Sequence, residues 1–274
     1  MGDEVRTLLS QTGIDTPAPA ASHRWRDDRV ASDAGRLHQV LALMQRNAKE
    51  REEMLQFLSH DMRSPQASIL SLLEDRGKPL PGGPALHDRI RRHAERTLRL
   101  ADDFVQLARL QSRQPVHEAV DIRDAMAQAG DMVWARAKAR AVTISQDGRH
   151  AADAPDLWVA GDAEALVRAF ANLLDNAVEV SPEGSVISCG VRQEGDEVIA
   201  HVADHGPGLP PERRDAPFAR FGYSGAAGEG GSGLGLSYVA TVAERHGGSA
   251  HYADGPAGGA CFSLRLPLMR DEEI

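Results

Sequence analysis

The 274-residue sequence predicts an α+β chain of two parts: a helical hairpin that joins a second copy in a dimeric four-helix bundle, followed by an α/β sandwich with a mixed sheet. Apolar residues recur every seven positions in the first part. Helical and alternating stretches follow one another in the second. The formal net charge of -9 argues against non-specific binding to nucleic acid, so we expect no nucleic-acid partner.

The first part begins after a polar lead-in, residues 1–34, which we expect to be disordered or a linker. Residues 35–112 are predicted to form the hairpin, whose first helix stops near DRGKPLPGGP (75–84). Arg51 and Pro65 interrupt the seven-residue repeat of this helix. One hairpin has too small a core to stand alone, so a dimer is expected. The seven-residue repeat of the first helix consists of Leu37, Leu41, Met44, Ala48, Leu55, Leu58, Met62, Ile69 and Leu72. The stripe of the second helix consists of Leu86, Ile90, Thr97, Leu100, Phe104 and Leu107.

The second part, residues 118–269, follows a boundary at 111–120. Apolar spacing predicts helices over 122–141 and 163–181 and a short helix after Gly235. Alternation predicts strands at 142–148, 156–162, 185–193, 196–204, 249–254 and 259–267. We expect one sheet, with helices covering one of its faces.

The segment FLSHDMRSP (57–65) carries the first group of reactive side chains. His60 falls beside the apolar seam, so its imidazole is expected on the exposed flank of the bundle. The adjacent Asp61 can orient the imidazole and raise the basicity of its free nitrogen. A plain surface histidine on a coiled coil is the alternative interpretation.

Two asparagines, Asn172 and Asn176, lie one helical turn apart in NLLDN and therefore share a face. Asparagine is a poor residue for a helix interior, and the chain has only three. A carboxamide oxygen suits Mg²⁺ among phosphate oxygens. A solvated polar pair is the alternative.

Glycines gather in two segments of the second part. In DHGPG (204–208), Asp204 follows a strand, where a carboxylate can accept from a base amino group, and Gly206 and Gly208 let the backbone approach it. A surface turn is the alternative there. In GEGGSGLGLS (228–237), the run leads into a helix, and free N–H groups at a helix start favour phosphates. This run includes Gly231, Gly233, Leu234 and Gly235, and a flexible linker is its alternative interpretation.

Together these motifs resemble those of two-component sensor histidine kinases. FLSHDMRSP is similar to the phospho-acceptor box, NLLDNAVEVSP to the N box, DHGPGLP and GSGLGLSYV to the two glycine boxes, and APFARF to the phenylalanine box. The resemblance covers roughly residues 36–268. It implies a Bergerat-type ATP site, autophosphorylation of His60 with Asp61 as base or orienting partner, and relay of the phosphoryl group to an aspartate of a response regulator.

The resemblance also implies roles for the other residues. Asp204 would hold the adenine amino group, Gly206 and Gly208 would shape the base pocket, and Asn176 would coordinate Mg²⁺ beside Asn172. A lid over ATP would contain Gly231, Gly233, Leu234 and Gly235 and be anchored by Phe218 and Phe221. No apolar run is long enough to span a membrane, so we expect a cytoplasmic location, alone or as the inner part of a membrane-associated sensor.

Four positions depart from the family pattern. Glu179 replaces a frequent lysine and Tyr223 a frequent arginine, which removes positive charge near a triphosphate. Arg213, Arg214 and Arg220 are candidates to compensate. His205 stands at a usual asparagine, and Ser64 at a usual threonine or asparagine.

Three alternatives to an active histidine kinase remain at this stage. The lost charges leave open an ATP-binding dimeric scaffold without turnover, a pseudokinase. The others are a different ATPase of the same fold and a serine kinase that would not need His60.

Overall fold

The computed structural model describes residues 42, 45, 48–49, 52, 56, 62–73, 86–112, 116, 118–147, 157–219, 234–255 and 258–270. The chain divides into two units, residues 1–55 and 56–274. In the first unit the described residues are all helical. The second unit contains the sheet and the helices discussed below.

The second unit opens with helical residues. Residues 62–73 form one helical run that continues through Pro65, so this proline does not end the helix. Helix α3 (Leu86–Ser112) follows and packs against α7 (Leu234–Arg245). The buried residues of α3 are Leu100, Leu107 and Leu110. Among the described residues, no helix combines the length and the apolar character needed to cross a membrane.

A five-stranded sheet forms the centre of the unit. Its strands are β2 (Thr143–Asp147), β4 (Val186–Glu194), β5 (Glu197–Ala203), β6 (Ser249–Asp254) and β7 (Ala260–Pro267). Their order is β2-β4-β5-β7-β6. Strand β2 is parallel to β4, and the other neighbours are antiparallel. The prediction of an α+β chain with a mixed sheet is therefore confirmed.

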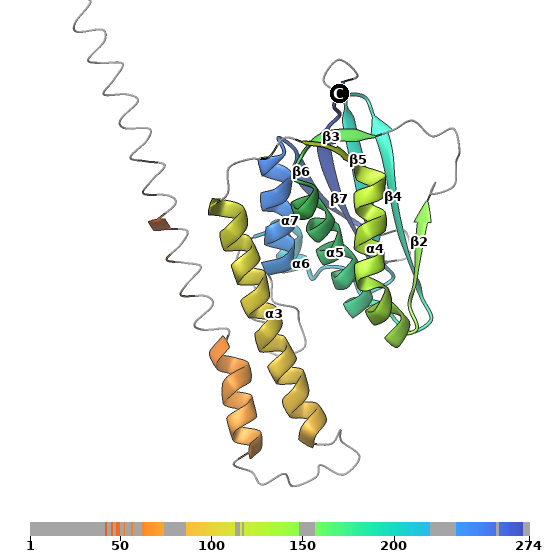
Figure 1. The fold of residues 1–274 in the computed structure, drawn as a ribbon. Helices are drawn as coiled ribbons and strands as arrows, with labels where there is room; N and C mark the ends of the chain where they lie inside the picture. Colours follow the sequence, from red (N-terminus) through yellow and green to blue (C-terminus); the bar gives the residue numbers. More distant parts are fainter. Residues whose placement is uncertain are drawn as a thin grey trace, which may run out of the picture. The chain divides into compact units, whose positions relative to one another are not determined.

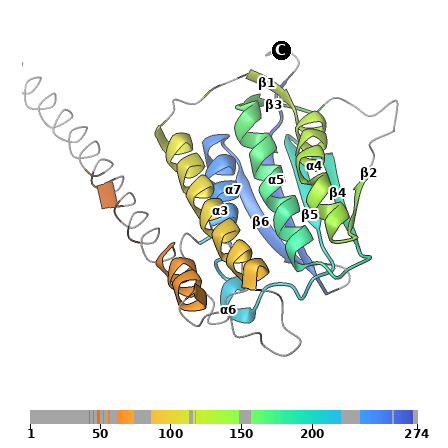
Figure 2. The ribbon, with the colours of Figure 1, turned by 60° about the horizontal axis from the view of Figure 1, so that its bottom comes forward.

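Helices α4 (Ile122–Ala139), α5 (Ala163–Val180) and α7 cover one face of this sheet (Figure 1; Figure 2). Asp162, the residue before α5, caps this helix, because its side chain accepts a hydrogen bond from the backbone N–H of Ala165. The core consists of side chains that the two layers bury between them, including Leu166, Phe170, Leu174, Val198, Val202, Phe262 and Leu264. The short helix α6 (Pro211–Arg214) lies in the segment expected to be a loop.

A second, two-stranded sheet corrects the expectation of a single sheet. Strand β3 (Trp158–Gly161) pairs antiparallel with β1 (Glu118–Asp121) and not with the five-stranded sheet. Most of strand β1 lies in the boundary expected at 111–120, and its four residues are too few to show an alternating pattern. It runs directly into α4, whose N-cap is Asp121.

Candidate functional site

Asp204 directly follows β5, and hydrogen bonds hold its side chain through one of the two carboxylate oxygens. It is only 2% exposed. Its Oδ1 accepts from the backbone N–H of Gly206 at 2.8 Å and of Ala260 at 3.1 Å. Among the described residues, no donor meets Oδ2. Both hydrogen bonds go to Oδ1, so Oδ2 keeps its capacity to accept and is suited to a ligand that donates.

The glycines after Asp204 are required by close approaches of the backbone. A Cβ on Gly206 would lie 2.7 Å from Val180 Cγ2, at the end of α5. Gly208 has a φ of 70°, which favours glycine, and a Cβ there would lie 3.2 Å from the carbonyl oxygen of Gly258. The loop is therefore pressed between the end of α5 and the turn that joins β6 to β7.

Gly259 is a residue of this region that the sequence analysis did not assign to the site. A Cβ on it would lie 2.0 Å from the carbonyl oxygen of Asp204, so no larger residue fits without a shift of the backbone. Its signal was present as the glycine pair that opens the last strand. A pair of glycines does not reveal which segment will cross it, so sequence reasoning could not connect it to Asp204.

Asn172 and Asn176 are half-buried on α5, while Leu173 and Leu174 beside them are buried in the core. A Cβ on Gly235 would lie 3.9 Å from Cβ and Cγ of Asn172. The structure thus brings the first turn of α7, where the glycine run ends, next to the first asparagine. Leu234, the first residue of α7, is fully buried.

These contacts arrange the predicted residues along one flank of α5. Asn172 lies next to Gly235. About two turns further along α5, Val180 lies next to Gly206, close to Asp204. Asn176 lies between them, one turn from each. Glycine backbone, two carboxamides and a buried carboxylate therefore converge on one surface.

Phe218 lies beyond this loop and packs edge-on against Phe262, with ring centroids 5.9 Å apart and planes at 76°. Phe262 is a buried residue of β7. This contact fixes the end of the described segment 157–219 to the sheet. Five other predicted site residues, His60, Asp61, Phe221, Gly231 and Gly233, lie outside the described residues.

Asp175, between the two asparagines, faces a different neighbour. Its carboxylate pairs with Arg136 of α4. Burial nevertheless raises the pKa of Asp175 to about 6, although the charges of Arg136 and of Arg99 on α3 oppose the rise. Asp103 of α3 adds to it. The ion pair with Arg136 favours the charged carboxylate, whereas burial favours the protonated form. Burial has the larger effect, since only 27% of the side chain is exposed.

The departures from the family pattern can be followed in part. Glu179 is exposed at the end of α5. The Nε of Arg214 donates to the carbonyl oxygen of Leu209 at 3.0 Å, and the guanidinium also pairs with Asp254. Arg214 therefore has partners other than a phosphate, while Arg220 and Tyr223 lie outside the described residues.

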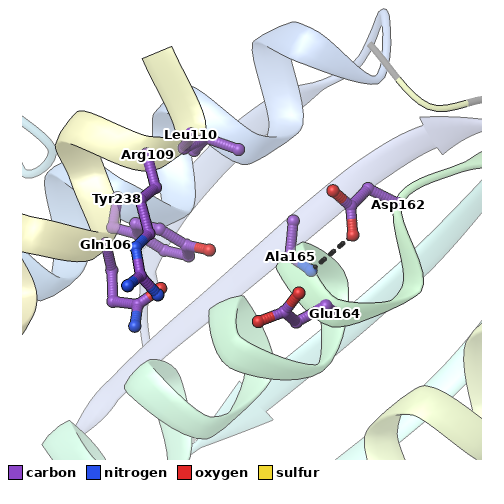
Figure 3. Close-up of a pocket in the computed structure, with 7 residues that line it drawn as sticks. All are labelled: Gln106, Arg109, Leu110, Asp162, Glu164, Ala165 and Tyr238. Atoms are coloured by element: carbon purple, nitrogen blue, oxygen red, sulfur yellow. Dashed lines mark hydrogen bonds between the residues drawn. The ribbon is translucent and has the colours of Figure 1, made fainter. Parts of the chain in front are cut away.

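Figure 3 shows a separate small cavity between α3, the start of α5 and α7. Its volume is about 20 Å³, enough for a single water molecule. None of the predicted site residues lines it, so it is not the predicted nucleotide site. Its lining residues are Gln106, Arg109, Leu110, Asp162, Glu164, Ala165 and Tyr238.

Comparison with known proteins identifies an ATPase domain in this part of the chain. Residues 161–270 match the family of histidine kinase-, DNA gyrase B- and HSP90-like ATPases. Sensor-like histidine kinase SenX3 of Mycobacterium tuberculosis is 34% identical over 232 residues, which cover 80% of this chain and 54% of SenX3. Signal transduction histidine-protein kinase/phosphatase MprB of Mycolicibacterium paratuberculosis is 34% identical over 256 residues, covering 86% of this chain and 48% of MprB.

A solved structure shares the fold. The Acinetobacter baumannii histidine kinase AdeS superposes with a TM-score of 0.57 at 18% identity, covering 77% of this chain and 98% of that structure. The chain spans about half the length of the curated relatives it matches. The matched ATPase domain, together with two sensor kinases that are each 34% identical over at least 80% of this chain, shows that the chain belongs to the sensor histidine kinase family.

Proposed function

We propose that this chain is the core of a sensor histidine kinase that transfers the γ-phosphoryl group of ATP to His60 and then to an aspartate of a response regulator. The observation that carries the proposal is the convergence on one flank of α5. Asn172, Asn176, Asp204 and Gly235 come from three segments that are distant in the sequence. They meet inside a domain that matches an ATPase family.

The proposed base pocket surrounds Asp204. The exocyclic amino group of adenine is a donor, and Oδ2 of this buried carboxylate is the acceptor it would meet. Gly206 and Gly208 let the loop lie flat beside the ring. The apolar side chain of Val180, which lies against Gly206 and is 38% exposed, would form one wall.

The proposed phosphate end lies toward α7. Gly235 and Leu234 open this helix, and free N–H groups at a helix start favour phosphate oxygens. Gly231 and Gly233 would complete the lid, held by Phe218 and Phe221. The half-buried carboxamide of Asn176 fits Mg²⁺, which prefers oxygen ligands and would neutralise charge on the phosphates. Asn172 would lie beside it.

The phosphoryl acceptor is His60, oriented by Asp61. A nitrogen of its imidazole would attack the γ-phosphorus, the bond to the bridging oxygen would break, and ADP would leave. Such a transfer depends mainly on positioning and on neutralised charge. The phosphohistidine would then pass its group to the response regulator. We place the chain in the cytoplasm, as a homodimer through its helical hairpin, alone or as part of a longer sensor.

A second candidate is an ATP-binding dimer without turnover. Glu179 places a negative charge on the exposed end of α5, and Arg214 is held by Leu209 and Asp254. Both observations reduce the positive charge available to a triphosphate. This candidate keeps nucleotide binding and differs only in the labelling of His60.

Labelling with γ-labelled ATP and Mg²⁺ separates the two candidates. The native chain is compared with His60→Gln, with binding of an ATP analogue measured in both. An active kinase gives an acid-labile, base-stable label that is absent from His60→Gln. Absence of label in a native chain that binds the analogue would favour the scaffold, and label retained in His60→Gln would exclude His60 as the acceptor.

A further inference from the structure

The loop that follows Asp204 ends at Leu209, and there a tyrosine of β6 meets it. The backbone N–H of Leu209 donates to the hydroxyl oxygen of Tyr252 at 3.3 Å. The same hydroxyl donates to Oδ1 of Asp254 at 2.7 Å. Burial and the bond to Asp254 raise the pKa of Tyr252, so the hydroxyl keeps its proton at neutral pH.

Arg214 of α6 closes a ring of polar contacts around Leu209. Its Nε donates to the carbonyl oxygen of Leu209 at 3.0 Å, and its terminal nitrogen lies 3.4 Å from Oδ2 of Asp254. Both backbone polar groups of Leu209 and both oxygens of Asp254 are therefore used. We call Tyr252, Asp254 and Arg214 the Leu209 clamp.

The clamp holds the far end of a loop whose near end is held by the same hairpin. At the near end, the N–H of Ala260 on β7 binds the carboxylate of Asp204. At the far end, Tyr252 and Asp254 on β6 hold Leu209, directly and through Arg214. The segment 204–209 is thus held at both ends by residues of β6 and β7, two strands that pair with each other.

The ring of Tyr252 adds an apolar contact to this arrangement. It packs against Phe262 with ring centroids 5.4 Å apart, and Phe218 contacts Phe262 as well. Removing only the hydroxyl of Tyr252 therefore leaves this packing in place. The polar and apolar contributions of the residue can be tested separately.

We propose that the Leu209 clamp is a positioning device that holds segment 204–209 in the shape that receives the adenine base. Tyr252, Asp254 and Arg214 are positioning residues, acting through the loop and not by contact with the nucleotide. This inference rests on the proposed function, because it assigns the loop to the ATP site.

The clamp should affect nucleotide affinity more than stability. The side chains of Arg214 and Asp254 are 47% and 58% exposed, and ion pairs in such positions contribute little to folding. A loop already held in its bound shape loses less conformational entropy when a ligand arrives. Loss of the clamp would therefore appear as weaker binding of ATP, with the maximal rate of labelling at saturating ATP unchanged.

The test is a calorimetric titration of the full chain with the Mg²⁺ complex of a non-hydrolysable ATP analogue. Tyr252→Phe is expected to raise the Kd by roughly two- to tenfold, the range for one lost hydrogen bond. The matched control is Ser249→Ala, which removes a hydroxyl from the opposite face of the same strand, where it contacts His251. An equal Kd for Tyr252→Phe and the native chain, with both folded by circular dichroism, would overturn the inference.

A double-mutant cycle tests whether the clamp acts as a unit. Arg214→Met removes the second anchor and keeps much of the side-chain volume. If the clamp is one device, the combined variant with Tyr252→Phe loses less affinity than the product of the two single losses. Losses that multiply would show independent contacts and overturn it. A native chain that does not bind the analogue would overturn the proposed function itself, an outcome distinct from either of these.

Discussion

Asp175 and its two asparagine neighbours show how single residues on one helix take different tasks. Asn172 and Asn176 lie toward the proposed phosphates, whereas Asp175 pairs with Arg136 on α4. Helical spacing predicted that the asparagines share a face. It could not predict the pair between Asp175 and Arg136, which are 39 positions apart, because such a contact depends on how α4 and α5 pack.

The raised pKa of Asp175 leads to a prediction about stability and pH. Its pKa is about 6 in the folded chain and near 3.8 when exposed, so the folded state binds more protons between these values. The free energy of unfolding should therefore fall as pH rises from about 4 to about 6, by about 1 to 2 kcal/mol for this partly exposed group.

Urea unfolding of the native chain and Asp175→Asn, followed by tryptophan fluorescence over this pH range, measures the effect. The neutral amide of the variant does not titrate. The native chain should lose stability relative to Asp175→Asn as pH rises. A difference between the two that stays constant with pH would refute the assignment.

At the scale of an element, helix α3 shows what the spacing of apolar residues can predict and what it cannot. The spacing predicted an amphipathic helix, which the structure has. It also placed Leu100 and Leu107 on the apolar stripe of this helix, and both are buried within one chain, in a helix that packs against α7. A periodic stripe shows which side chains seek burial and does not reveal the partner that buries them.

A second apolar pair on α3 supports the predicted dimer. Leu98 and Val105 are 66% and 43% exposed and lie one seven-residue repeat apart, so they share a face. In a four-helix bundle they would be covered by the second copy. The double change Leu98→Asp and Val105→Asp should raise the dimer dissociation constant on the order of a hundredfold or more.

Sedimentation equilibrium of the full chain measures this change. Arg92→Gln, a change of charge at an exposed position of α3 that lies about a third of a turn around the helix from Leu98, is the control and should leave association intact. An unchanged dissociation constant in the double variant would place the dimer contact elsewhere.

For the whole molecule, the order and spacing of the motifs indicated the family more specifically than any single motif did. The fold class followed from the periods and helix-start signals of the elements, and the resemblance of the motifs to those of the family implied that the asparagine and glycine segments share one site. The pairing of β1 with β3, the approach of Gly259 to Asp204 and the Leu209 clamp did not. These features depend on contacts between segments far apart in the chain, which local patterns do not encode.

The central claim, that one flank of α5 is an ATP site centred on Asp204, is tested most directly by measuring nucleotide binding to Asp204→Asn. The asparagine oxygen can still accept from Gly206 and Ala260, so the fold should persist. Its NH₂ group would stand where Oδ2 stood and would oppose the amino group of adenine. Calorimetric titration should show saturable binding of the Mg²⁺ complex of the ATP analogue by the native chain, weakened roughly ten- to hundredfold in Asp204→Asn. Equal affinity in both, or no binding by the native chain, would contradict the account.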